Sequence, residues 1–139
     1  GEANVLNNRH PVVWGQLSLL CLQKQRFEEA EQALAQAYKL ELAEPALLTA
    51  LSDALYEAGK WADAEAAVRR AMRHDASAPA YKALGNSLME QHRYEEAVAA
   101  YRSVIAHPEA APDVVDFCKR QASHMLHFHL NRPDEASAL

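Results

Sequence analysis

The sequence predicts an all-α protein, a solenoid in which antiparallel helix pairs stack into a right-handed superhelix. Segments of one pattern recur along the chain, and their equivalent residues Ala30, Ala64 and Ala97 lie 34 and then 33 residues apart. Alanine, which has the highest helix propensity, supplies 28 of the 139 residues, whereas glycine supplies only four. A period of this length, carried by helix-forming residues, is typical of stacked helical hairpins.

Each recurring segment holds two helical patterns separated by a turn. In the second segment, apolar or small residues between 48 and 55 follow the i, i+3, i+4, i+7 spacing of one helix stripe. Those between 64 and 72 follow i, i+4, i+7, i+8, which is a stripe on a second helix. Gly59 lies between them and suits the left-handed conformation that ends many helices. A proline stands near the start of each first helix, where its missing N–H costs nothing: Pro11, Pro45 and Pro79.

The repeat organises the chain as one array. Residues 11–44, 45–78 and 79–110 are predicted to form three repeats, and residues 2–8 the last turn of an earlier second helix. Residues 111–139 are predicted to form a partial fourth repeat. Its motif alanine lies 39 residues after that of the third repeat, so we expect inserted residues and a lengthened first helix.

Two kinds of residue are expected to hold the repeats together. Small residues let paired helices approach closely, and aromatic residues beside the turns wedge against a neighbouring helix. Gln25 and His92 stand where the second repeat has Gly59, so we expect less sharply defined turns at both places. The residues given structural roles are Trp14, Leu17, Phe27, Ala30, Leu51, Trp61, Ala64, Leu84, Gly85, Tyr94 and Ala97.

This pattern resembles the tetratricopeptide-repeat (TPR) family over nearly the whole chain. The shared features are an aromatic, a leucine and a small residue in the first helix, then a turn, an aromatic followed by Glu-Ala, and a final alanine. The resemblance implies a scaffold that binds other proteins, catalyses nothing and needs no cofactor. It also implies that the partner, a peptide or a helix, lies in a concave groove lined by the first helices.

A second resemblance covers about a third of the chain. Residues between 2 and 48 are similar to the C-terminal repeats of the cilia- and flagella-associated protein 70 family, whose members are axonemal. Asn7-Asn8 and Cys21-Leu22 belong to the shared residues, and the repeat does not dictate them. This resemblance implies a docking module in the axoneme of cilia and flagella, supporting motility.

Composition weighs against several classes of function. The net charge of −5 provides too little basic surface for a nucleic-acid partner. No run of about 18 apolar residues is present, so we expect no membrane span. Cys21 and Cys118 are far apart and fit no metal or redox spacing, and unpaired thiols suit a reducing compartment such as the cytoplasm.

A cluster of histidines, His124, His127 and His129, is a candidate for a metal site. On a helix, His124 and His127 fall on the polar side with Arg120 between them, whereas His129 and Phe128 are expected to face inward. A cation between two ligands and a third ligand pointing elsewhere make a poor tetrahedral site. We therefore predict no metal site and, because no nucleophile and base share a local motif, no catalytic residues.

The predicted binding groove consists of first-helix positions outside the core stripe. Several of them are more apolar than an idle surface needs, which favours a peptide or helix ligand. The expected groove residues are Val12, Gln16, Leu19, Leu22, Thr49, Asp53, Tyr56, Lys82, Asn86 and Met89.

Other interpretations stay open at this point. The array could be purely structural, stacking on neighbouring repeats without a ligand. It could instead capture the carboxylate tail of a chaperone, since Lys82 and Asn86 lie one helical turn apart, but Gly15 and Leu19 occupy the matching places in the first repeat. A carboxylate needs several convergent donors to offset its desolvation, and two are too few. An array with apolar end surfaces is also expected to associate end to end.

Overall fold

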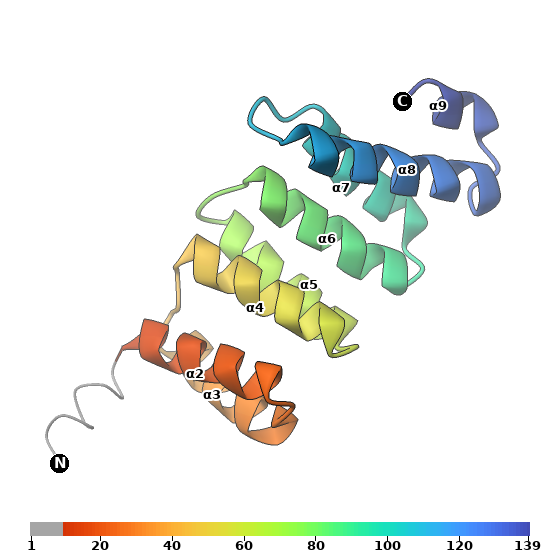
Figure 1. Ribbon diagram of the computed structural model, residues 1–139. Helices are drawn as coiled ribbons and strands as arrows, with labels where there is room; N and C mark the ends of the chain where they lie inside the picture. The colour runs from red at the N-terminus through yellow and green to blue at the C-terminus, as the bar shows by residue number, and fades with distance from the viewer. Residues whose placement is uncertain (1–9) are drawn as a thin grey trace, which may run out of the picture. The chain divides into compact units, whose positions relative to one another are not determined.

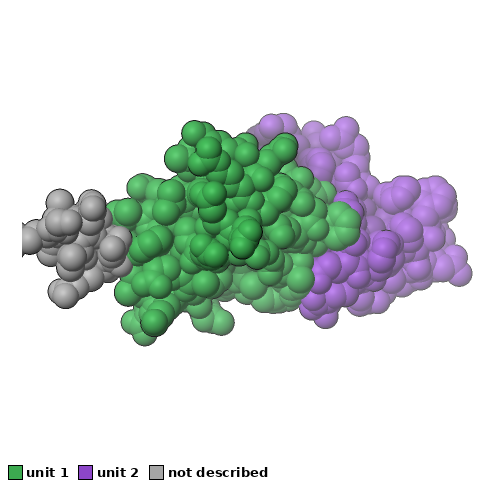
Figure 2. Space-filling view, turned by 90° about the horizontal axis from the view of Figure 1, so that it is seen from below, with its two compact units in different colours: residues 1–75 green, residues 76–139 purple. Residues whose placement is uncertain are grey.

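The computed structural model describes residues 10–139, and every regular element in that range is an α-helix (Figure 1). The predicted helical turn at residues 2–8 falls outside the described residues. The chain divides into two compact units, residues 1–75 and 76–139 (Figure 2). Consecutive helices pair within each unit, so the predicted all-α class of stacked hairpins is confirmed.

Unit 1 contains two helical hairpins that share one core. The first consists of α2 (Pro11–Gln23) and α3 (Phe27–Lys39), and the second of α4 (Pro45–Glu57) and α5 (Trp61–Met72). The first helices α2 and α4 contact one another side by side (Figure 1). Leucines and alanines fill the space between the hairpins, and its fully buried members include Ala37, Leu48, Leu51, Ala64 and Ala71.

Unit 2 begins with the same hairpin and ends differently. Helices α6 (Ala78–Glu90) and α7 (Tyr94–Ile105) form the hairpin, and α8 (Pro112–Phe128) packs on α7. At 17 residues α8 is longer than any earlier described helix, each of which has 12 or 13. The short α9 (Pro133–Ser137) folds back on α8.

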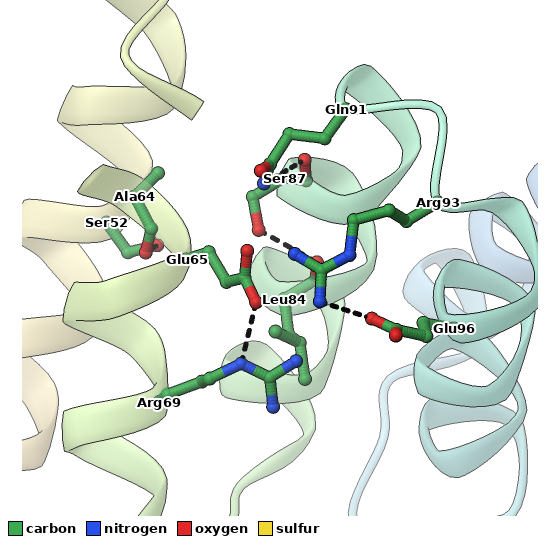
Figure 3. Close-up of polar contacts among 9 residues, drawn as sticks. All are labelled: Ser52, Ala64, Glu65, Arg69, Leu84, Ser87, Gln91, Arg93 and Glu96. Carbon is green, nitrogen blue, oxygen red and sulfur yellow. Dashed lines mark hydrogen bonds and ion pairs between the residues drawn. The ribbon is translucent and has the colours of Figure 1, made fainter. Parts of the chain in front are cut away.

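Within each hairpin of unit 1, a buried serine ties the first helix to the second. The Ser18 hydroxyl donates to the carbonyl of Ala30 over 2.8 Å. The Ser52 hydroxyl likewise donates to the carbonyl of Ala64 over 2.7 Å; Figure 3 shows these two residues. Both serines are at most 1% exposed, so each bond lies in a dry contact. A serine and an alanine are small enough for the two backbones to meet, and the hydroxyl still finds an acceptor.

In the hairpin of unit 2, the contact between the two helices is made by a different pair of residues, Gly85 and Tyr101. Gly85 replaces the serine, and the ring of Tyr101 lies where a Cβ on Gly85 would come within 2.7 Å of it. Tyr101 is fully buried, and its hydroxyl donates to Oδ1 of Asn86 over 2.5 Å. The equivalent second-helix residues of the earlier repeats are Leu34 and Val68, which are smaller. The missing side chain at Gly85 therefore makes room for the larger tyrosine.

The turns within the first three hairpins are alike despite their different residues. Gln25, Gly59 and His92 each adopt a positive φ, of 62°, 78° and 62°. At each turn, two backbone N–H groups bond back to the end of the first helix, as Gln25 to Leu22 and Arg26 to Cys21 do in the first. This is the Schellman arrangement. The expectation of looser turns without glycine is wrong, because these bonds hold Gln25 and His92 in the left-handed region.

Ion pairs and one ring stack hold the end of unit 2. Arg132 bonds to Glu135 and, over 2.5 Å, to Glu95 of α7. The hydrogen bond from Arg132, together with one from Arg102, lowers the pKa of Glu135 to about 2. The ring of His129 stacks on Tyr94 with centroids 4.0 Å apart. The turn between α8 and α9 is therefore attached to the start of α7 by polar and aromatic contacts on the surface.

A glycine at position 25 should stabilise the protein. The left-handed region costs an ordinary residue roughly 1 kcal/mol, and Gln25→Gly removes that cost outside any helix. We expect the free energy of unfolding to rise by about 0.5–1 kcal/mol. The matched control is Ala35→Gly, exposed within α3, which should lower it by about 1 kcal/mol. Urea unfolding followed by circular dichroism measures both, and a lower stability for Gln25→Gly would contradict the strain at this turn.

The size match between Gly85 and Tyr101 can be tested by a double-mutant cycle. Gly85→Ala should cost about 1–3 kcal/mol, because its methyl group meets a buried ring that cannot move freely. Adding Tyr101→Leu, the residue type at the same place in the first repeat, should remove most of that cost. Gly15→Ala is the control, since its new methyl group meets only the flexible ends of Leu47 and Leu42. Additive effects of the two changes in unit 2 would contradict the match.

Candidate binding surface

The predicted groove residues of unit 1 come from α2 and α4, which are neighbours. Leu22 is buried in the shared core, and Val12, Leu19 and Tyr56 are half-buried against that core. Thr49 is half-buried too, and its hydroxyl donates to the Pro45 carbonyl over 2.9 Å. Gln16 and Asp53 are exposed. We call these seven residues the α2–α4 surface; the core holds its apolar side chains in place, and one amide and one carboxylate are exposed beside them.

The predicted groove residues of unit 2 are engaged within the unit. Lys82, Asn86 and Met89 are half-buried on α6. The ammonium group of Lys82 lies 4.7 Å from the centre of the Phe117 ring, a cation–π contact. The side-chain oxygen of Asn86 accepts the bond from Tyr101. Both polar residues that a chaperone-tail site would need therefore have a partner inside unit 2.

A hollow of about 410 Å³ adjoins the α2–α4 surface at the turn end of unit 1. It shares Leu22 with that surface, and sequence reasoning did not single out most of its other residues for binding. Their positions in the repeat could have indicated them, because most of them lie at the end of a first helix or in the turn that follows it. Its lining residues are Leu22, Gln23, Gln25, Phe27, Ala54, Glu57 and Ala58.

Two residues at the end of α8 that were expected to face the core lie at the surface. His129 is exposed and stacks on Tyr94, and Phe128 is 68% exposed. The inward expectation is wrong for His129 because α8 ends at Phe128, so the helical spacing does not extend to it. It is wrong for Phe128 because this last residue of α8 contacts the rings of His124 and His127 on its own helix and not the core. Within residues 10–139, no three His, Cys, Asp or Glu side chains converge as ligands for a metal ion.

Two titratable side chains, Cys118 and Tyr38, are held in their neutral forms by burial. Cys118 is fully buried, and burial raises its pKa to about 11, so the thiol stays protonated at neutral pH. Burial likewise raises the pKa of Tyr38 to about 12, while the guanidinium of Arg70 lies 4.2 Å from its ring centre. Both groups contribute to packing in their neutral forms.

Most residues given structural roles are buried or half-buried, including every alanine among them, but two are exposed. Leu17 is 43% exposed, and Trp61 is 37% exposed. Leu17 lies on a face of α2 against which no described helix packs. Among the described helices, none has both the length and the apolar character required to cross a bilayer.

Comparison with known proteins shows which family this chain is related to. Residues 1–122 match the family model described as the cilia and flagella-associated protein 70 C-terminal domain. Over 47 residues, the chain is 51% identical to the cilia- and flagella-associated protein 70 of Macaca fascicularis and to that of Homo sapiens. This stretch is 34% of the chain but only 5% of the macaque protein and 4% of the human protein.

The family match extends well beyond the stretch that carries the sequence identity. It covers all of unit 1 and continues into α8, so it includes the hairpins whose turns and small-residue contacts are described above. The resemblance inferred from the sequence is confirmed. The chain belongs to the family of the cilia and flagella-associated protein 70 C-terminal domain.

Proposed function

We propose that this chain is a docking module of the ciliary or flagellar axoneme, which binds a protein partner on the α2–α4 surface and so supports motility. The observation that carries the proposal is the half-burial of Leu19 and Tyr56, which expose part of an apolar side chain while the core holds the rest. Side chains held in this way lose little conformational freedom when a partner covers them.

The polar groups of this surface are suited to selecting a partner. Gln16 on α2 and Asp53 on α4 are exposed near the half-buried residues, and an amide and a carboxylate can both accept hydrogen bonds from a ligand. Asp53 also favours a partner with a cationic group at that place. A peptide or helix that joins an apolar stripe to a basic residue would match this arrangement.

The setting of the proposal comes from the relatives, whose names associate them with cilia and flagella. Capture of a chaperone tail has less support, because Lys82 and Asn86 already contact Phe117 and Tyr101. A purely structural array is supported by the repeat, but it gives no role to the parts of Leu19 and Tyr56 that are exposed.

Binding of the purified chain to demembranated axonemes tests the proposal. The double variant Gln16→Lys and Asp53→Lys changes two exposed side chains of the α2–α4 surface. It should lower the affinity for axonemes at least tenfold, or about 1.4 kcal/mol. The matched control, Ala35→Lys with Ala66→Lys, adds two lysines at exposed positions of the second helices α3 and α5 and should bind as the wild type does.

Co-sedimentation with axonemes gives the affinities, and circular dichroism checks that helical content is equal in all three proteins. If both double variants bind as tightly as the wild type, the partner does not use the α2–α4 surface. If the wild type does not sediment with axonemes at any concentration, the axonemal role itself is wrong.

A further inference from the structure

Helix α2 carries a stripe of large aliphatic side chains that no described helix covers. Val13, Leu17 and Leu20 are 40%, 43% and 47% exposed, and they follow the i, i+4, i+7 spacing of one helix face. Beside them lies a hollow of about 540 Å³ between α2 and α3. Its lining is mostly apolar on α2 and polar on α3: Trp14, Leu17, Cys21, Glu29, Gln32, Ala33 and Gln36.

Unit 1 itself shows what packs against a stripe of this kind. The residues of α4 that lie one repeat later are Leu47, Leu51 and Ala54. Leu51 is fully buried, and the other two are half-buried against the core. The end of Leu47 lies 2.8 Å from the place of a Cβ on Gly15, so this face of α4 rests on the α2–α3 hairpin. The stripe on α2 has the same form and is suited to resting on a hairpin.

One hairpin of the chain has a matching surface open. Between α8 and α9 lies a hollow of about 450 Å³, at whose side Phe128 is 68% exposed. Ala136 holds the place in the second-helix motif that Ala30 holds in the first repeat, where Ala30 is buried with 1% exposed. Ala136 is only half-buried. The lining residues are Lys119, Arg120, Ser123, His124, Phe128, Ala136 and Leu139.

Charges at the two surfaces are complementary. The hollow beside the stripe contains one carboxylate, that of Glu29, and no cation. The hollow between α8 and α9 contains Lys119 and Arg120 and no acidic side chain. Helix α2 itself carries no charged residue, so the carboxylate available to pair with Lys119 or Arg120 is that of Glu29 on α3.

We propose that the stripe on α2 of one molecule docks in the hollow between α8 and α9 of a second copy. The α2–α3 and α6–α7 hairpins cannot receive it in this way, because α4 covers the first and α8 packs on α7 of the second. Since two different surfaces meet, the contact is heterologous and leaves one surface of each kind free on every dimer. Association therefore continues to longer chains as the protein concentration rises. This interface uses none of the residues of the α2–α4 surface, so its test is independent of the proposed function.

Complementation between two variants of the full 139-residue chain tests the interface. Leu17→Glu places a charge on the stripe, and Phe128→Glu places one in the hollow, both at exposed positions. Sedimentation velocity should show that the wild type grows beyond a dimer with concentration, whereas each variant alone stays monomeric. An equimolar mixture of the two should form a dimer and stop there, because each variant retains one intact surface. Ala66→Glu, exposed on α5, is the matched control and should associate as the wild type does.

Three results would overturn the proposal. A wild type that stays monomeric at every concentration would mean that a second copy does not cover the stripe. Self-association of Phe128→Glu alone would indicate a symmetric contact between two α2 helices. A mixture that remains monomeric would show that the two surfaces do not bind one another. If circular dichroism shows that either variant has lost helix, Leu20→Glu and Leu139→Glu replace the pair, with the same expected outcomes.

Discussion

The close approach of the two helices in each hairpin is the constraint on which the rest of this structure depends. At the contact, Ser18 and Ser52 meet the carbonyl groups of Ala30 and Ala64 directly, and no larger side chain would leave room for that bond. The hydroxyl satisfies its own hydrogen-bonding need in a place where water does not reach. Because this contact fixes the spacing of each hairpin, it also fixes which faces of the helices are left for the next hairpin.

The third repeat shows that the constraint applies to the combined size of the two side chains that meet between the helices. Gly85 stands where the earlier repeats have a serine, so no serine hydroxyl is present there. The ring of Tyr101 fills the space, and its hydroxyl bonds to Asn86. A core packed at the density of an organic crystal tolerates such exchanges only in pairs. This exchange also affects a residue outside the core: Asn86, at an outward position of the first helix, accepts a hydrogen bond from the buried Tyr101.

The same packing constraint decides how the first-helix residues of the two units are held. In unit 2, the polar residues of the first helix contact Tyr101 and Phe117, so less of their bonding capacity is left for a partner. In unit 1, Leu19 and Tyr56 are held by the core and still reach the surface. Stacking, in turn, makes a buried interface of the stripe on α4, while the equivalent stripe on α2 is exposed.

Period and residue type by themselves determined that this chain is helical, that its helices pair in chain order, and that Ala30, Ala64 and Ala97 are buried. These features follow from local spacing and from the size of single side chains, which a sequence displays directly. The family could also be inferred, because its shared residues lie close together in the chain.

Only the tertiary structure decided which apolar residues are covered. Leu17 and Leu51 occupy the same place in the repeat, yet one is 43% exposed and the other fully buried, because only Leu51 has a hairpin against it. His129 lies outside the core because α8 ends one residue before it, where a continuous helix would have turned His129 inward, and Phe128 is the exposed last residue of α8. The pairing of Asn86 with Tyr101 likewise joins residues of two helices. Burial depends on a neighbour that can lie far away in the chain, and the spacing within one helix carries no information about that neighbour.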